Sequence, residues 1–376
     1  MARSGGSEGW VESSVFGPAG CFDPMVFLTV GLPSRFAEWC DGVCCALVQA
    51  ALGPYELASG NTLEEIAQAA LKTRASRLVI GARQPTEDLR GALLETGRRF
   101  VVALDDPRAA FYNLVARHGI AAIHATRAAA GSCAAMLTYA VLPNALVLRA
   151  EREGRDPAAA AAAIARWFGI EIEDAAIEAV VQGQAHAAPE AIAEQHALDL
   201  WWGNMGGADQ ALAEGTLNGY VDYFARGTMG PMIWTRELFF LGDEPGSAAT
   251  RTVEIRGPSR TLVYGPYLTL PPGSWAATVV LAVAKGAANV NYIVEILAGE
   301  RCLCLGRGTI EPRGEGLCEV TIEFGVSETT DQPIALRVIN LSPASDGRLA
   351  LVHVVLSPRL KARPELLVEL ATALGW

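Results

Sequence analysis

Short apolar runs alternate with longer amphipathic stretches through the first half of the chain. In the first run, Met25 to Val30, five of six residues are apolar, and Gly31, Pro33 and a segment of helical spacing follow it. Such a run is typical of a parallel strand that is covered on both faces. The alternation predicts strands at 25–30, 77–80, 99–104 and 145–149, and helices at 35–52, 63–71, 86–96, 107–117, 121–140, 157–169 and 173–182. We therefore expect a parallel α/β sheet in this half.

The pattern changes in the second half of the chain. One further helix is predicted at 188–202, and an aromatic-rich stretch covers 220–240. After Thr250 the apolar residues fall in short alternating segments separated by Gly, Pro, Asn and Asp, which is typical of an antiparallel β-sandwich. The predicted strands are 261–263, 275–283, 292–297, 319–324, 334–340 and 349–356, and a last helix is predicted at 364–374.

The expected organisation follows from these changes of pattern. Residues 1–24 are rich in Gly, Ser and Pro and are expected to form an irregular arm. An α/β domain at 25–185 is followed by an aromatic connecting segment at 186–250, a β-sandwich at 251–360 and a C-terminal helix at 361–376. A chain of 376 residues is long enough for two hydrophobic cores.

Charge and hydropathy exclude several classes of partner. The net charge is −11 and the pI is near 5.1, so neither nucleic acid nor an anionic membrane is expected as a partner. A polyanion would need a local basic patch. No run approaches the roughly 18 to 20 apolar residues of a membrane span, and the N-terminus lacks the apolar core of a signal peptide. We expect a cytoplasmic protein.

The eight cysteines predict neither a metal centre nor a disulfide framework. Cys40, Cys44 and Cys45 share one predicted helix, with no histidine at ligand spacing nearby, so we expect no metal. Cys302 and Cys304 are two residues apart in a predicted strand and are expected to point to one face. A disulfide with Cys318 is the alternative there to apolar packing.

Three stretches of the first half together resemble the sulfotransferase family. VGLPSRF, from Val30, resembles that family's strand and phosphate loop; LDDPRAAFYNL, from Leu104, resembles the segment that holds the 3′-phosphate of the sulfate donor. NALVLRAEREGRDPAAAAAAIARWFGIE, from Asn144, resembles the family's late strand and the helix after it. The order of the three is that of the family. The resemblance covers roughly residues 25 to 185 and implies a P-loop-like α/β fold.

The resemblance implies few surviving donor contacts. Ser34 and Arg35 keep a hydroxyl and a guanidinium in the loop, although in swapped order, and Arg108 is the surviving arginine of the second segment. If the chain still binds 3′-phosphoadenylyl sulfate (PAPS), these three residues would hold it. His118 is then the candidate general base; the alternative is that it caps the end of a helix.

Other positions depart from the family pattern. Phe36 and Glu38 stand where small or hydroxyl residues are expected, so a bulky ring and a negative charge replace a phosphate cradle. Asp105 replaces an arginine, and Asn113 replaces a serine. These changes favour a degenerate fold, a pseudoenzyme without a cofactor, over an active sulfotransferase.

The β-rich half resembles the sandwich modules, similar to carbohydrate-binding modules, that are appended to bacterial glycan-related proteins, and the resemblance implies a jelly-roll-like sandwich. The resemblance rests on the runs YGPY, from Tyr264, and LPPGSW, from Leu270. Aromatic rings stack on the apolar faces of sugar rings, so Tyr264, Tyr267, Trp275 and Tyr292 are candidates for binding carbohydrate. The alternative for each is a place in the sandwich core.

The aromatic band at 220–240 has three interpretations. It can dock the two halves onto each other, form an interface with a protein partner or a second copy, or line a substrate groove. The first hypothesis for function is a non-catalytic polysaccharide-binding or scaffolding protein of bacterial surface-glycan biology. One alternative is a divergent PAPS-dependent carbohydrate sulfotransferase, and another is a structural subunit of a multiprotein assembly.

Overall fold

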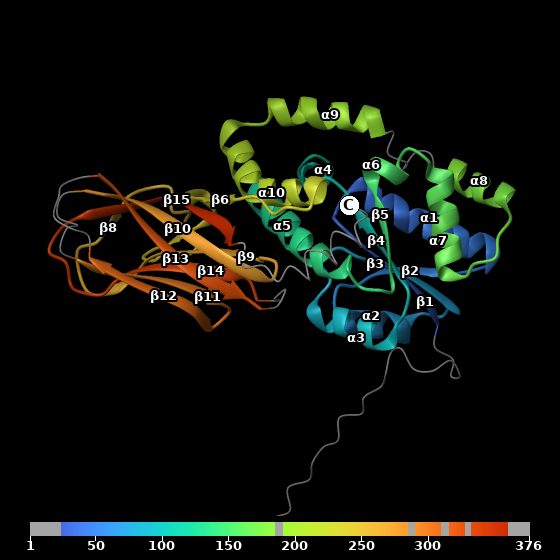
Figure 1. The fold of residues 1–376 in the computed structure, drawn as a ribbon, viewed down its shortest axis with the longest axis horizontal. Coiled ribbons are helices and arrows are strands. Elements are labelled where there is room, and N and C mark those ends of the chain that lie inside the picture. The colour runs from blue at the N-terminus through green and yellow to red at the C-terminus, as the bar shows by residue number, and fades with distance from the viewer. Residues whose placement is uncertain (1–23, 185–190, 285–289, 310–315, 328–331, 360–376) are drawn as a thin grey trace, which may run out of the picture.

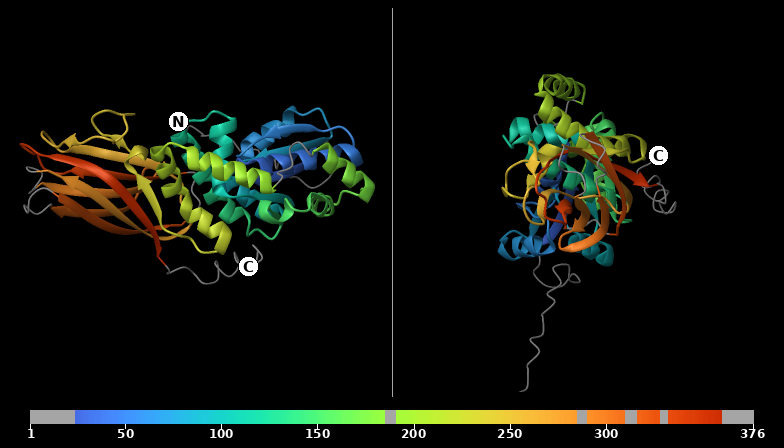
Figure 2. Two further views of the ribbon diagram at one scale, coloured as in Figure 1. Left: turned by 90° about the horizontal axis from the view of Figure 1, so that it is seen from above. Right: turned by 90° about the vertical axis from the view of Figure 1, so that its left-hand side faces the viewer.

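A computed structural model describes residues 24–184, 191–284, 290–309, 316–327 and 332–359. The chain forms two parts that lie side by side along its long axis, an α/β part and a β-sandwich (Figures 1 and 2). The predicted arm at 1–24 lies almost wholly outside the described residues, and the predicted helix at 364–374 lies outside them entirely.

The α/β part is built on a five-stranded sheet in the order β2-β3-β1-β4-β5, in which neighbouring strands are parallel. The run that begins at Met25 forms the central strand β1, which lies between β3 and β4. The predicted parallel α/β sheet is therefore confirmed. Its strands are β1 (Met25–Gly31), β2 (Glu56–Ser59), β3 (Arg77–Ala82), β4 (Phe100–Leu104) and β5 (Ala145–Arg149).

Helices cover both faces of this sheet, as the apolar run of β1 predicts. Phe27 packs on one face with α1, α7 and α8, whereas Val26, Leu28 and Val30 pack on the other with α2 to α5. The helices are α1 (Arg35–Ala51), α2 (Leu63–Lys72), α3 (Glu87–Thr96), α4 (Pro107–Tyr112), α5 (Ala122–Tyr139), α6 (Ala150–Glu153), α7 (Pro157–Phe168) and α8 (Asp174–Gly183).

Local signals in the sequence explain where several helices begin. Thr62 and Glu65 form a complete capping box at the start of α2. Asp106 caps α4 with Pro107 at its first position. The helix predicted at 107–117 divides, because α4 passes into a π-helical turn, η1 (Asn113–Arg117).

The segment between the two parts is more ordered than its sequence predicts. The predicted helix at 188–202 corresponds to α9 (Ala191–Asn204), but the 20-residue helix α10 (Gly207–Arg226) was not predicted. The strands β6 (Met232–Thr235) and β7 (Phe240–Leu241), with the 3-10 turn η2 (Arg236–Leu238) between them, follow α10. β6 pairs with β15 and β7 with β9, so this segment contributes strands to the sandwich.

The second half is an antiparallel sandwich, as predicted. One sheet has the order β13-β10-β15-β6, with β8 also paired to β15, and the other has the order β12-β11-β14-β9-β7. The remaining strands are β8 (Val253–Glu254), β9 (Arg260–Leu268), β10 (Gly273–Val283), β11 (Asn291–Ala298), β12 (Arg301–Thr309), β13 (Gly316–Val326), β14 (Ile334–Asn340) and β15 (Arg348–Arg359).

One hydrophobic cluster runs without interruption from the parallel sheet into the sandwich. It passes from β1, β3 and β4 through α4, α5 and α10 to the inner faces of both sandwich sheets. Tyr220, Tyr223, Trp234 and Phe239 of the band at 220–240 are buried in it. In the described residues these aromatics dock the two parts of one chain, so their rings offer no surface to a protein partner.

A bulge in β12 changes the expected placing of the sandwich cysteines. The register between β11 and β12 shifts at Ile296/Leu297, so Cys302 and Cys304 do not point to one face. Cys302 is exposed, whereas Cys304 and Cys318 lie partly buried against the core, and all three are free thiols. Among the helices of the described residues, none is long and apolar enough to cross a membrane.

Candidate functional site

The loop at the carboxyl end of β1 is where the sequence places the remains of a phosphate site. Only Leu32, Pro33 and Ser34 connect β1 to α1. The Ser34 hydroxyl caps α1 by accepting a hydrogen bond from the Ala37 amide at 3.4 Å, and the Ser34 amide donates to the Leu32 carbonyl at 2.7 Å. The Leu32 amide donates across to the Ala103 carbonyl of β4 at 3.4 Å. The polar groups of this loop therefore serve the fold.

Apolar side chains fill the space that an anion would need. Leu32 and Phe36 are fully buried on opposite faces of the sheet, and Phe36 stacks on Trp39 with ring centroids 5.7 Å apart. A Cβ atom on Gly31 would come within 2.8 Å of the Ala37 Cβ and 2.9 Å of the Ala103 carbonyl. α1 thus packs directly on the ends of β1 and β4, where doubly wound sheets bind phosphates.

A small polar cluster lies beside this loop. Asn113 is buried and donates from Nδ2 to the Pro33 carbonyl at 3.1 Å and to Glu38 Oε1 at 3.0 Å. His118 Nε2 lies 3.5 Å from the same Glu38 oxygen. The structure therefore brings the candidate base His118 next to the loop and gives it a carboxylate partner, but places a negative charge in the first turn of α1.

The other two donor candidates are positioned as follows. Arg108 binds Asp106 with two guanidinium nitrogens, its Nη2 lying 2.6 Å from Oδ2, and this hydrogen-bonded pairing raises the pKa of Arg108. Arg35 is half-buried in the first turn of α1. The donor-binding roles of Ser34, Arg35 and Arg108 therefore stay predictions.

The four aromatic candidates of the sandwich separate into two pairs. Trp275 and Tyr292 are only 2% and 4% exposed; Trp275 donates its indole N–H to the Pro271 carbonyl at 3.2 Å, and burial raises the pKa of Tyr292 to about 12. Both are core residues. Tyr264 is half-buried and Tyr267 is 41% exposed, with ring planes 73° apart, so they do not form a flat platform.

Tyr267 and Tyr264 belong to a cluster with Phe240. The Phe240 centroid lies 5.5 Å from that of Tyr264 and 6.4 Å from that of Tyr267. Tyr267 has φ 62°, in the left-handed region that a bulky residue adopts only at a cost of order 1–3 kcal/mol. Strained residues of this kind cluster at functional sites, so the surroundings of Tyr267 are a candidate binding site.

Tyr267 stands at one end of a pocket between the two parts of the chain, which we call the seam pocket. Its volume is about 460 Å³, within the roughly 300–1,000 Å³ typical of ligand sites. The walls come from the connection after β3, from one side of α5 and from the sandwich. The lining residues are Gln84, Pro85, Thr86, Glu87, Arg127, Ala128, Gly131, Ala135, Thr138, Tyr139, Tyr267, Thr269 and Pro333.

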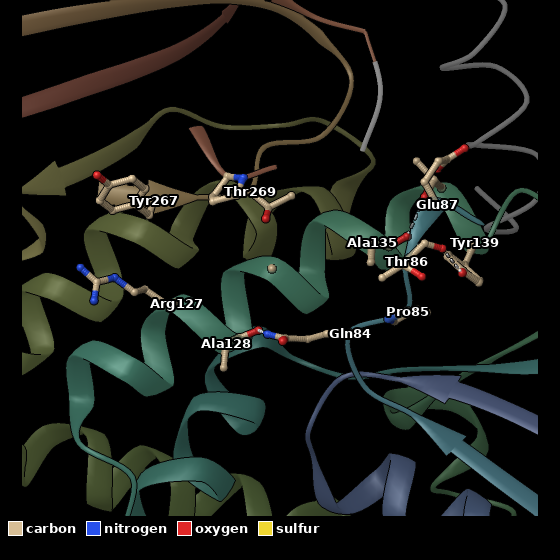
Figure 3. A pocket seen from close by; sticks show the side chains of 13 residues that line it. Gln84, Pro85, Thr86, Glu87, Arg127, Ala128, Ala135, Tyr139, Tyr267 and Thr269 are labelled. Carbon is tan, nitrogen blue, oxygen red and sulfur yellow. Dashed lines mark hydrogen bonds between the residues drawn. The ribbon is translucent and has the colours of Figure 1, made fainter. Parts of the chain in front are cut away.

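The seam pocket has two chemically different ends (Figure 3). Arg127 and Tyr267 lie at one end, Glu87, Thr86 and Tyr139 lie at the other, and Gln84 and Thr269 lie between them. Glu87 is paired with Arg90 of its own helix. The Tyr139 hydroxyl donates to the Thr86 carbonyl at 2.6 Å. The polar groups at the Glu87 end are therefore engaged by the protein.

Several polar atoms elsewhere in the pocket keep hydrogen-bonding capacity. Gln84 Nε2 donates to the Ala128 carbonyl at 2.9 Å, and its Oε1 has no partner within the described ranges. Thr269 Oγ1 lies 3.9 Å from where a Cβ on Gly131 would stand, so the missing side chain of Gly131 leaves this hydroxyl open to the pocket. Acceptor and hydroxyl groups beside an exposed aromatic ring suit a polyhydroxylated ligand.

Sequence reasoning identified only Tyr267 among the lining residues. No recognised sequence motif includes Arg127, Gln84 or Gly131. The sequence of α5 is rich in alanine and predicts a structural helix. The pocket forms only when residues near 85 and 130 meet residues near 268 and 333. No cluster of three His, Cys, Asp or Glu side chains able to hold a metal was found in the described residues.

Comparisons with known proteins identify no family for this chain. No family model matches it, and no curated protein matches it. Among solved structures, a Stig cyclase from Fischerella sp. TAU is 19% identical, with a TM-score of 0.21, and the match covers 27% of this chain and 56% of that one. The chain thus spans little more than half of that protein.

Two further solved structures are each similar to less than half of the chain. A mouse sulfotransferase complexed with PAP is 16% identical over 45% of this chain and 65% of that one, with a TM-score of 0.32. The module TmCBM61, in complex with β-1,4-galactotriose, is 11% identical over 34% of this chain and 88% of that one, with a TM-score of 0.22. Likenesses this weak carry no argument about function.

Proposed function

We propose that this protein is a non-catalytic polysaccharide-binding or scaffolding protein of bacterial surface-glycan biology, and that it holds a sugar unit in the seam pocket. The observation that carries this proposal is the ring of Tyr267, 41% exposed at the end of a cavity with open hydrogen-bonding groups. A sugar ring packs its C–H face on an aromatic ring, and its hydroxyls bond to polar side chains at the edge.

The loop at the carboxyl end of β1 and the first turn of α1, residues 32–38, which we call the head of the parallel sheet, support the non-catalytic part of the proposal. A sulfate donor needs a cavity lined by amides and cations, whereas Leu32 and Phe36 are buried at this point and the Ser34 hydroxyl caps α1. Glu38 adds a negative charge in the same turn. These features disfavour a bound bisphosphate nucleotide.

The test is binding of a panel of bacterial surface polysaccharides and their oligosaccharides, followed by calorimetry of those that bind. Tyr267→Ala removes the aromatic ring but, unlike a change to glycine, keeps a Cβ atom at this position of positive φ. Because the ring is the proposed contact with the sugar, we expect at least a tenfold loss of affinity. Leu305→Ala is the matched control, because Leu305 is 42% exposed on β12, at the other edge of the same sheet. Failure of every glycan to bind, or equal binding by Tyr267→Ala, would contradict the proposal.

One observation favours the divergent sulfotransferase as a second candidate. His118 Nε2 lies 3.5 Å from Glu38 Oε1, and a histidine oriented by a carboxylate is a common general base. This candidate requires binding of adenosine 3′,5′-bisphosphate, the product nucleotide. Micromolar binding that Arg35→Ala abolishes would support a transferase; no heat at millimolar nucleotide would eliminate it.

A further inference from the structure

Arg127 is the cation of the seam pocket, and it has no acidic partner in the described part of the chain. Its Nε donates to the Pro266 carbonyl at 3.2 Å and its Nη2 to the Leu238 carbonyl at 3.0 Å. Its guanidinium carbon stands 5.2 Å from the centroid of Phe240. These contacts hold the side chain in place, and its Nη1 makes no hydrogen bond to a described residue.

The surroundings of Arg127 leave its charge only partly compensated. The side chain is half-buried, and burial lowers the pKa of the guanidinium, although it stays protonated at neutral pH. Carbonyl dipoles and an aromatic face stabilise a buried cation less than a carboxylate does. An incoming anion would therefore gain a charge-assisted hydrogen bond at a site that is already desolvated and fixed.

The position of Arg127 joins this charge to the proposed sugar site. The carbonyl that accepts from its Nε belongs to Pro266, the residue before Tyr267. The carboxylate of the pocket, Glu87, lies at the opposite end and is neutralised by Arg90. An anionic substituent on a sugar at Tyr267 would meet a cation and no facing carboxylate.

Resting on the function proposed above, we propose that the seam pocket selects an acidic sugar unit, one that carries a carboxylate or a sulfate ester, with Arg127 binding the anionic group. The net charge of −11 makes a densely charged polyanion a poor ligand, because a chain of this net charge repels it. One acidic unit for each protein chain, at a chain end or within a sparsely charged polymer, suits a single unpaired arginine.

The test compares matched sugars against the full-length protein by calorimetry. The probes are short oligosaccharides of glucuronic, galacturonic and mannuronic acid, each with its methyl ester, its neutral parent and the 6-sulfated parent. We expect one acidic form to bind at least tenfold more tightly than its ester and its neutral parent. The carboxylate and sulfate arms decide which anion it is.

Two measurements assign the effect to Arg127. Arg127→Gln should remove the preference for the acid, whereas Arg127→Lys should keep part of it. Arg127 also ties α5 to β9, so a variant at this position could disturb the fold, and the wild-type protein supplies a check that needs no variant. Because salt screens the attraction between charges, the affinity for the acid should fall between 20 and 500 mM salt, while the affinity for the ester should not.

The outcomes separate this inference from the proposed function. Equal affinity for acid, ester and neutral parent, with binding still lost in Tyr267→Ala, would overturn the acidic preference and leave a glycan-binding protein. An acid preference that persists in Arg127→Gln would overturn the assignment to Arg127. No binding by any of the sugars or by the wider polysaccharide panel would overturn both.

Discussion

The head of the parallel sheet and the seam pocket are lined by similar residue types but differ in what those residues contact. At the head, the Ser34 hydroxyl caps α1, Asn113 bridges Pro33 and Glu38, and Arg108 is bound to Asp106. In the seam pocket, Arg127 Nη1 and Gln84 Oε1 lack partners in the described residues. Among the described residues Asn113 Oδ1 also lacks a partner at the head, but it is fully buried, whereas Arg127 and Gln84 line a pocket. The difference teaches that an unsatisfied polar atom marks a binding site only where the fold also leaves a cavity beside it.

The largest effect is expected from opening the head of the sheet. Phe36 is fully buried and stacked on Trp39, so Phe36→Ala should lower the free energy of unfolding by about 3–5 kcal/mol. Urea denaturation measures the change. Leu94→Ala is the control, since Leu94 is 48% exposed and its loss should cost less than about 0.5 kcal/mol. A tolerant Phe36→Ala variant would show that the head is an adaptable cavity, contrary to our interpretation.

Filling the seam pocket should affect binding more than stability. Gly131→Leu places a side chain against the Gln84 amide, 3.3 Å from the new Cβ, and beside Thr269. Glycan affinity should fall at least tenfold, with little change in the free energy of unfolding. Gly91→Leu in α3 is the matched helix glycine, because a Cβ there meets nothing within 4 Å. Unchanged affinity in Gly131→Leu would place the sugar elsewhere.

A smaller effect is expected from the support beneath the pocket. The buried Tyr220 hydroxyl of α10 donates to the Thr269 carbonyl at 3.2 Å. Tyr220→Phe should lower the free energy of unfolding by about 0.5–1.5 kcal/mol, the usual net contribution of one hydrogen bond. Tyr264→Phe, which removes a hydroxyl outside that contact, should change it by less than about 0.5 kcal/mol. Equal effects of the two variants would show that the Thr269 contact contributes nothing.

The smallest effect concerns the ion pair of Asp41 and Arg83, which lies between the head of the sheet and the seam pocket. Asp41 of α1 accepts hydrogen bonds from Thr29 and from Arg83, the neighbour of the pocket residue Gln84. Burial raises the pKa of Asp41 above its usual 3.8, in spite of Arg83. The folded state therefore binds this proton more tightly than the unfolded state, and the stability from Asp41 falls as pH rises from about 3.8 through the raised pKa.

Comparing wild type with Asp41→Asn measures this pH dependence. The free energy of unfolding of the wild type, minus that of Asp41→Asn, should fall as pH rises from 3 to 7, because the variant cannot titrate at this position. A shift in the opposite direction would show that the attraction of Arg83 outweighs burial, and that the pKa of Asp41 is lowered.

The sequence predicted the elements whose signals are local. The apolar run of β1 predicted a strand covered on both faces, and the capping box predicted the start of α2, because each depends on neighbouring residues. The missed helix α10 contains Gly215 and Gly219, and glycine is an unfavourable residue inside a helix. A Cβ on Gly215 would lie 2.6 Å from the Ile233 carbonyl, so this glycine allows α10 to pack closely on β6.

The site was less predictable than the fold. Tyr267 was a candidate because aromatic rings can stack on sugar rings. Trp275 and Tyr292 were candidates for the same reason, but both are buried. Exposure depends on the tertiary packing of α5 and β9 and has no local signature. Arg127 could be recognised only once its missing partner was visible, since a lone arginine on an alanine-rich helix reads as a solubilising residue.

The uninterrupted apolar cluster means that the chain is not divisible into interchangeable modules. Cutting it near residue 250 would strand β6 and β7 away from their partners β15 and β9, and would leave the inner faces of α5 and α10 open to water. Either fragment alone should aggregate, and the whole should melt in one cooperative step. A lineage carrying this protein could not easily exchange its sandwich for another by recombination, so both parts must change together.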